Sequence, residues 1–143
     1  MLEPHYNKLR DFAMEFEALD GVVKFVGFSI FDTCYTAYSS SLITTEERKR
    51  EILELYIFPD EIDETISCLE DYLTKVIPEG YVGGIGVDMM VVKQSEGFLL
   101  HPCVEINLRR TMGHVALSFE TSDDLPDRNM IIDFARNFEL CIK

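Results

Sequence analysis

Residues 83–109 constrain the fold most, because they have the pattern of a β-hairpin. Two apolar runs rich in β-branched residues, 83–92 and 98–109, flank a short polar segment that ends in Gly97. Such a segment between two apolar runs predicts two antiparallel strands joined by a tight loop. Since side chains alternate between the two faces of a strand, Glu105, Asn107 and Arg109 are expected on one face.

The register of this hairpin decides which acidic side chains meet. If Lys93 lies opposite Phe98, Asp88 lies opposite Cys103, on the same face as Glu105 and diagonally next to it. A shift of one residue would move Asp88 to the far face.

Two carboxylates and an amide oxygen on one face suit a hard divalent cation such as Mg²⁺. Arg109 is placed to hold a phosphate oxygen with its fork of donors. A purely structural interpretation stays open, because an E-x-N-x-R triplet is short and arises by chance. In that interpretation Asp88 ends a strand, Glu105 pairs with an arginine, and Asn107 caps the segment that follows.

The order of motifs over residues 80–116 resembles the C-terminal part of ATP-grasp enzymes. It consists of Gly-x-Gly-Val-Asp ending at Asp88, two apolar strands, Val-Glu-Ile-Asn-Leu-Arg ending at Arg109, and Thr-Met-Gly-His ending at His114. The resemblance extends back to Glu3-Pro4, which is similar to the end of the hinge that touches adenine and ribose.

The resemblance implies ATP and Mg²⁺ as cofactors. By it, Asp88, Glu105 and Asn107 are expected to be Mg²⁺ ligands. Arg109 is expected to act catalytically on the phosphate or acyl-phosphate and to bind the nucleotide, with Glu3 as a second nucleotide contact. The activity implied is that of a carboxylate-amine or carboxylate-thiol ligase, with a small carboxylate and a nucleophile as substrates.

The resemblance covers only half of an ATP-grasp domain. Residues 1–143 are therefore expected to form a single domain that is the C-terminal half of a longer protein and inactive by itself, because the phosphate-binding lysines and glycine-rich lid of the N-terminal subdomain are not recognisable. The alternative is a non-catalytic ATP-grasp-like domain used for protein association. A homo-oligomer is compatible with either.

Composition narrows the partners. A net charge of −13 argues against a nucleic-acid surface, which needs a basic face. Four widely spaced cysteines without a C-x-x-C pair favour reduced thiols. No apolar run approaches membrane-spanning length and no signal peptide is recognisable, so we expect a cytoplasmic protein without membrane contact.

The remaining pattern predicts an α+β fold, an antiparallel sheet with helices packed on one face. Strands are expected at 11–18 and 22–31 around an Asp-Gly turn. A loop of hydroxyls and aromatics at 32–43 either covers a ligand or is an ordinary connection. Helices are predicted at 44–57, opened by a Thr44–Glu47 capping box, at 60–76, from Thr111 or Gly113, and at 127–141.

Three further groups have both a functional and a structural interpretation. Glu15 and Glu17 could be metal or base candidates, but alternation of this kind is more often a solvated sheet face. His114 fits a hydrogen-bonding residue at a helix start better than a general base. The glycines at 83, 84 and 86 match no phosphate-loop spacing and indicate close backbone approach where the strand begins.

Overall fold

The structure of the chain, a computed structural model, describes residues 6–34, 37–133 and 139–143. These residues form one seven-stranded sheet in the order β5-β4-β1-β2-β3-β6-β7, with every neighbouring pair antiparallel. The strands are β1 (Lys8–Leu19), β2 (Val22–Cys34), β3 (Ala37–Ile43), β4 (Gly83–Lys93), β5 (Phe98–Asn107), β6 (Arg128–Asp133) and β7 (Glu139–Ile142). The helices are α1 (Glu46–Glu54), α2 (Pro59–Val76) and α3 (Met112–Leu117).

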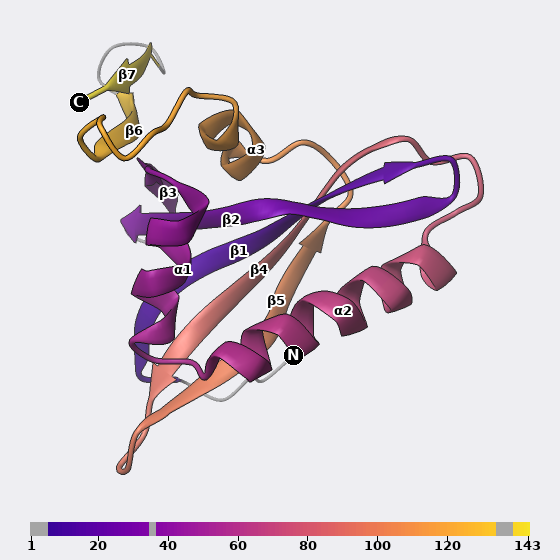
Figure 1. Cartoon of the computed structure of the whole chain (residues 1–143), viewed down its shortest axis with the longest axis horizontal. Coiled ribbons are helices and arrows are strands. Elements are labelled where there is room, and N and C mark those ends of the chain that lie inside the picture. The colour runs from indigo at the N-terminus through magenta and orange to yellow at the C-terminus, as the bar shows by residue number, and fades with distance from the viewer. Residues whose placement is uncertain (1–5, 35–36, 134–138) are drawn as a thin grey trace.

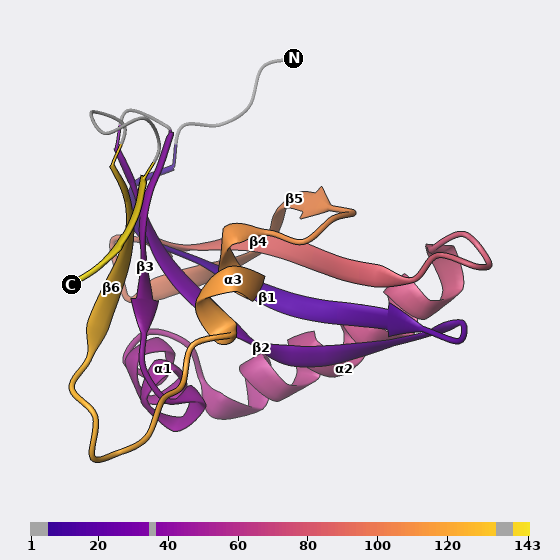
Figure 2. The ribbon, with the colours of Figure 1, turned by 90° about the horizontal axis from the view of Figure 1, so that it is seen from above.

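The two longer helices lie on one face of the sheet, and α3 lies on the other (Figures 1 and 2). Phe12 and Phe16 of β1 pack in the core with residues of α1 and α2. Glu15, on the opposite face of β1, approaches Gly113 of α3. The predicted α+β fold, an antiparallel sheet with helices packed on one face, is confirmed, and the short α3 covers part of the other face. Among the described helices, none is both long and apolar enough to span a bilayer.

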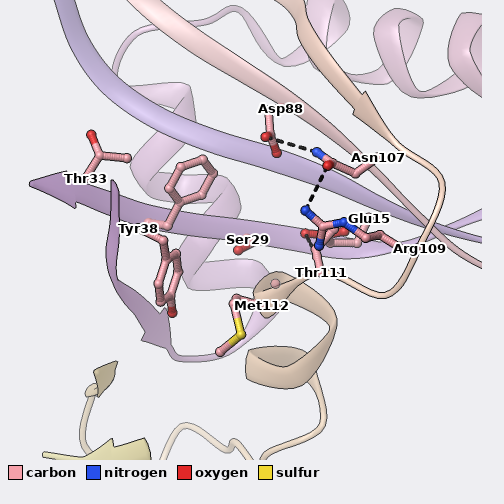
Figure 3. Close-up of a pocket in the computed structure, with 11 residues that line it drawn as sticks. Glu15, Ser29, Thr33, Tyr38, Asp88, Asn107, Arg109, Thr111 and Met112 are labelled. Carbon is pink, nitrogen blue, oxygen red and sulfur yellow. Dashed lines mark hydrogen bonds between the residues drawn. The ribbon is translucent and has the colours of Figure 1, made fainter. Parts of the chain in front are cut away.

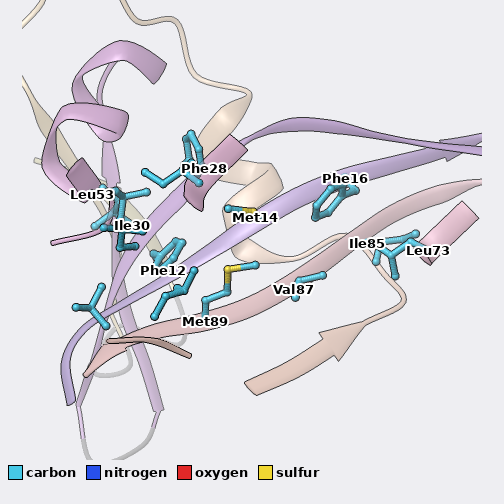
Figure 4. Packing of buried hydrophobic residues seen from close by; sticks show 14 of the residues in the cluster. Phe12, Met14, Phe16, Phe28, Ile30, Leu53, Leu73, Ile85, Val87 and Met89 are labelled. Carbon is cyan, nitrogen blue, oxygen red and sulfur yellow. The ribbon is translucent and has the colours of Figure 1, made fainter. Parts of the chain in front are cut away.

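The apolar core fixes which face of each strand points inward. Figure 4 shows the large buried side chains of β1 and β4 converging with those of the helices. Burying a side chain of this size contributes about 1.5–3 kcal/mol, and a slip of one residue would turn the whole apolar set outward. The register of β1 is therefore strongly specified. The central members, each at most 1% exposed, are Phe12, Met14, Phe16, Leu53, Leu73, Ile85, Val87 and Met89.

The N-terminal hairpin forms as predicted. Asp20 and Gly21 both have positive φ, of 51° and 76°, which is the conformation that a two-residue turn between twisted strands requires. β1 begins at Lys8, before the predicted start at Asp11, and β2 continues to Cys34.

Two predictions for the second half of the sheet were wrong. Residues 37–43 form β3 instead of a loop, and the segment predicted as a helix at 127–141 forms β6 and β7, with 134–138 lying outside the described residues. β6 pairs with β3, and β7 pairs with β6. Short apolar runs fit the periodicity of a helix as well as that of a strand. Pairing with the edge strand β3 decided for strands.

The first helix is shorter than predicted and begins one residue later. Thr45, not Thr44, is its N-cap and accepts a hydrogen bond from the Arg48 amide. Thr44 instead donates to Asp127 across 2.6 Å. The helix ends at Glu54, whereas α2 matches its prediction closely.

The predicted register of the β4–β5 hairpin holds only near its loop. Lys93 pairs with Phe98 as expected, but Asp88 pairs with Glu105 and not with Cys103. The ladder shifts because residues 102–104 together oppose Met89. Pro102 has no N–H to donate to the ladder, and proline in a strand is typically found at such bulges.

Candidate functional site

Three of the predicted site residues, Asp88, Asn107 and Arg109, line an open cavity on the face of the sheet that α3 covers in part. The cavity measures about 220 Å³ and lies between β1, β2, β3, the β4–β5 hairpin and the start of α3. Figure 3 shows Asp88, Asn107 and Arg109 toward one side and Tyr38 and Met112 toward the other. Both halves of the chain therefore contribute to it.

A row of hydrogen bonds joins three of the predicted residues. Asn107 donates from Nδ2 to Asp88 across 3.3 Å, and Arg109 donates to Asn107 Oδ1 across 3.1 Å. Glu105 lies directly opposite Asp88 in the ladder. The face expected to hold Glu105, Asn107 and Arg109 is thus the face that carries Asp88. The structural interpretation would pair Glu105 with Arg109 or Arg110. Instead Arg109 donates to Asn107 and Arg110 to Glu17, and among the described contacts none joins Glu105 to either arginine.

Like charges crowd around Asp88. Burial raises the pKa of Asp88 to about 6, and the neighbouring carboxylates of Glu15 and Glu105 add to the rise, against opposing contributions from Asn107 and Arg109. An excess of negative charge beside hard oxygen donors is the environment that a divalent cation would relieve. Carboxylate and amide oxygens are donor types that suit Mg²⁺, and in this structure Asn107 turns its Nδ2 toward Asp88 and its Oδ1 toward Arg109.

The site contains a buried acid that sequence reasoning assigned to solvent. Glu15 is 1% exposed, so the interpretation as a solvated sheet face was wrong for this residue. It accepts a hydrogen bond from Thr111 Oγ1 across 2.8 Å and lies 2.9 Å from His114 Nδ1. Glu17 does reach solvent and pairs with Arg110. The difference arises because α3 covers Glu15. Thr111 at the start of this helix lies 96 residues from Glu15 in the sequence, so no pattern near Glu15 predicts that it is buried.

Thr111 and His114 form a capping box at the start of α3. Thr111 accepts from the His114 amide, and the His114 side chain accepts from the Thr111 amide. The prediction of a hydrogen-bonding residue at a helix start is confirmed. The other ring nitrogen, Nε2, lies 3.0 Å from the Phe16 carbonyl oxygen.

Three glycines allow the strands and α3 to approach closely, as predicted for the first two. A Cβ at Gly84 would lie 2.8 Å from His114 Nε2, and one at Gly86 would lie 2.5 Å from Thr111. At Gly113 it would lie 1.8 Å from Glu15 Oε1. The space around the Glu15 carboxylate therefore depends on the absence of side chains at these positions.

Not every predicted residue can be placed. Glu3 lies outside the described residues, so its role as a nucleotide contact stays a prediction. Within the part of the chain that the structure describes, no group of three or more His, Cys, Asp or Glu side chains is arranged to hold a metal ion. The predicted ligand set contains two carboxylates, Asp88 and Glu105, and the amide of Asn107, so it has only two side chains of these four types.

Comparisons with known proteins find likeness in fold only. No protein-family model matches the chain, and no curated protein matches its sequence. The structure is similar to that of N5-carboxyaminoimidazole synthetase from Staphylococcus aureus complexed with ADP, at 11% identity and a TM-score of 0.48, over 90% of this chain and 36% of that chain. A second structure of that enzyme matches at 10% identity and a TM-score of 0.46, over 89% and 35%.

The chain thus spans about a third of the length of the enzyme that it matches. At this identity the likeness concerns the chain path and says nothing about what this chain binds.

Proposed function

We propose that this chain is the Mg²⁺-ATP-binding C-terminal half of an ATP-grasp ligase that activates a carboxylate as an acyl-phosphate. The observation that supports this most is the row of Asp88, Asn107 and Arg109 along one side of the cavity, with Glu105 opposite Asp88. In sequence order and residue type this row matches the metal and triphosphate end of the ATP-grasp site.

The residues proposed to hold Mg²⁺ are Asp88, Glu105 and Asn107. A bound Mg²⁺ would neutralise the negative charge of the transferring phosphoryl group. Asp88 is present as an anion at neutral pH, above its raised pKa of about 6. Asn107 orients the carboxylate of Asp88 through the hydrogen bond between them.

Arg109 is proposed to bind the transferring phosphoryl group. One of its donors is engaged by Asn107, and the side chain is otherwise exposed at the rim of the cavity. A guanidinium fixed at one nitrogen retains donors for two oxygens of a phosphoryl group. Charge stabilisation of this kind is the main contribution a protein makes to phosphoryl transfer.

The other jaw of the nucleotide site is proposed to come from an N-terminal subdomain that is not part of these 143 residues. The small carboxylate and the nucleophile would bind between the two parts. We expect the 143-residue chain to bind Mg²⁺-ATP weakly and to turn over nothing.

Calorimetric titration of Mg²⁺-ATP into the chain, and into a longer protein that includes the second subdomain, tests the proposal. Binding to both should weaken at least tenfold in Glu105→Gln and in Asn107→Ala. The control variant is Glu96→Gln, an exposed acid in the β4–β5 loop, which should bind like the parent. Unchanged binding and unchanged ATP-dependent phosphate release in both site variants would show that Glu105 and Asn107 do not form the Mg²⁺-ATP site. Full catalysis by the 143-residue chain would refute the proposal that it is half of a larger domain.

A second candidate function, a non-catalytic association domain, is favoured by the outer strand of the sheet. β5 is an edge strand in which Val104 and Ile106 are exposed, and Leu108 directly after it is exposed as well, each to between 40% and 54%. Apolar edges of this kind promote pairing with another chain. Sedimentation of the chain distinguishes the two functions. A stable complex without Mg²⁺-ATP binding would favour association, whereas a monomer that binds Mg²⁺-ATP would favour the ligase.

A further inference from the structure

The cavity extends beyond the row of Asp88, Asn107 and Arg109 to an end for which the proposed function names no ligand. Its lining continues over β2 and β3 to the start of α3. In Figure 3 the labelled side chains of this part lie away from the polar row. The residues there, which we call the apolar end, are Phe31, Thr33, Tyr38 and Met112.

The polar atoms of the apolar end are already engaged within the protein. Tyr38 donates its hydroxyl to Oγ of the fully buried Ser41 across 2.9 Å. Thr33 Oγ1 donates to Asp11 across 3.1 Å and accepts from Lys8 across 3.2 Å. The other two side chains of the apolar end, a phenyl ring and a thioether, have no donor. A ligand at this end therefore meets mainly apolar surface.

The apolar end is held in place by the smaller hydrophobic cluster of the protein. Tyr38 and Met112, both partly buried, pack against Ile43, Ala116 and Met130, which are at most 3% exposed. The hydrogen bond to Ser41 fixes the far end of the Tyr38 ring as well. Side chains that are already ordered cost a ligand little entropy on binding, so this end is a preformed site.

The acid between the two ends is not free to bind a ligand. Strand β1 lies between β4 and β2 in the sheet, so Glu15 lies between the polar row and the apolar end. Its Oε1 accepts from Thr111 across 2.8 Å, and its Oε2 lies 2.9 Å from His114 Nδ1. Both oxygens are thus engaged by α3, and Glu15 forms a wall of the cavity.

The volume of the cavity limits its occupant. The 220 Å³ of the cavity correspond to about seven water molecules at roughly 30 Å³ each. This space holds one aromatic ring with a short polar group, and it is too small for a nucleoside together with its phosphates. The base of ATP is therefore not expected at the apolar end.

We infer that the carboxylate substrate of the ligase bears a compact apolar group, of the size of one aromatic ring, that binds at the apolar end while its carboxylate faces Arg109. This inference rests on the proposed function and names the substrate class of the same cavity. Burial of a ring beside Tyr38 and Met112 is favoured by the hydrophobic effect and by aromatic and sulfur contacts. A charged or sugar-like group would lose its water there without gaining hydrogen bonds.

Phenylacetamide, an uncharged probe, tests the apolar end by NMR of the isotopically labelled chain. We expect the backbone amide signals of Ser29 and Gly113, which also line the cavity, to shift, and acetamide at the same concentration to leave them unchanged. The apparent affinity should fall at least tenfold in Met112→Glu, because a ring would then bury a charge. Met112→Leu preserves the apolar surface and should retain binding.

The matched control is Val115→Glu, which adds the same charge to the same helix at an exposed position outside the cavity lining. It should bind phenylacetamide like the parent. Equal shifts from acetamide, or an affinity for phenylacetamide that is unchanged in Met112→Glu, would overturn the inference.

Phenylacetate tests whether the ring belongs to the carboxylate substrate. Mg²⁺ should raise its affinity about tenfold and leave that of phenylacetamide unchanged, because only the carboxylate gains from a bound cation. Glu105→Gln should remove this gain. No gain from Mg²⁺, or benzylammonium that binds more tightly than phenylacetate in the presence of Mg²⁺, would overturn the assignment of the ring to the carboxylate substrate.

The inference and the proposed function can fail separately, because phenylacetamide binding requires neither Mg²⁺ nor ATP. Mg²⁺-ATP binding that is intact while phenylacetamide does not bind would refute only the inference. Phenylacetamide binding that is intact while Mg²⁺-ATP binds to neither the chain nor the longer protein would refute the proposed function.

Discussion

At the scale of single residues, Asp88 shows how a site is assembled at the expense of stability. Glu105 lies opposite it in the ladder and Glu15 faces it from β1. Like charges directly opposite each other in a sheet are destabilising. The hydrogen bond from Asn107 compensates only in part, since the pKa of Asp88 remains raised to about 6.

The raised pKa predicts a pH dependence of unfolding. The folded state binds the Asp88 proton more tightly than the unfolded state, so the contribution of Asp88 to stability falls as pH rises from about 4 to about 6 and stays low above that. Asp88→Asn should therefore raise the free energy of unfolding at pH 7.5 by roughly 1 kcal/mol, allowing for solvent screening, and change it little near pH 4. Urea unfolding at both pH values measures this.

The control for Asp88→Asn is Asp71→Asn, which removes an exposed acid from α2. It changes the net charge equally but should leave the free energy of unfolding within ±0.5 kcal/mol. A loss of stability in Asp88→Asn at pH 7.5 would contradict the crowding of like charges.

At the scale of elements, α3 lies close to the sheet because Gly113 has no side chain. Gly113 lets the helix lie against Glu15 and Ser29. A Cβ added at position 113 would lie 2.6 Å from the Cβ of Ser29. The helix thereby covers one end of the cavity and buries the Glu15 carboxylate.

Gly113→Ala should destabilise the protein by about 1–3 kcal/mol, because an added methyl has no room between Glu15 and Ser29. Helix propensity alone predicts the opposite sign, a gain of up to about 1 kcal/mol. Thermal unfolding decides between them. Val115→Ala, at a more exposed position of the same helix, is the control, and a stabilised Gly113→Ala variant would show that the close approach is not required.

Helix α2 is tied to the sheet by a side chain that satisfies the backbone of β2. Glu70 accepts the Phe25 amide across 2.8 Å and the Lys24 ammonium across 3.2 Å. The hydrogen bond from Phe25 lowers the pKa of Glu70. Its stabilisation is therefore present above about pH 4.5 and is lost as pH falls through the lowered pKa.

Glu70→Ala should lower the free energy of unfolding at pH 7 by about 1–2 kcal/mol, because the Phe25 amide loses its acceptor. The difference from the parent should shrink below pH 4. Glu64→Ala changes an exposed glutamate on the same helix to the same residue, so it should differ from the parent by less than 0.5 kcal/mol. Equal losses in the two variants in urea unfolding would show that the hydrogen bond from Phe25 is not the cause, because replacing Glu by Ala does not lower helix propensity.

At the scale of the whole molecule, charge opposes compactness. The chain has 26 acidic and 13 basic residues, and a net charge of this size destabilises the folded state by self-repulsion. The exposed ion pairs contribute little against it.

Raising NaCl from 0.05 M to 0.5 M should therefore raise the midpoint of thermal unfolding by a few degrees, because screening shortens the range of the repulsion. Sorbitol at matched osmolality separates screening from solvent exclusion, since it does not change the ionic strength. A midpoint that falls with NaCl would mean that attractive ion pairs dominate the surface.

The sequence by itself determined the elements whose signals are local. The two hairpins follow from alternation around an Asp-Gly turn and around a short loop that ends in Gly97, and α2 follows from its apolar period. The face shared by Glu105, Asn107 and Arg109 follows from the two-residue repeat of a strand, which does not depend on the rest of the chain.

Only the tertiary structure decided the features that depend on distant partners. Pairing with β3 turned the predicted last helix into strands, a bulge next to Pro102 brought Glu105 opposite Asp88, and α3 buried Glu15. In each case contacts between residues far apart in the sequence decided the outcome. The common face of Glu105 and Asn107 was thus fixed by strand periodicity, whereas the position of Asp88 opposite Glu105, the cavity and the buried acid within it exist only because separate parts of the chain meet there.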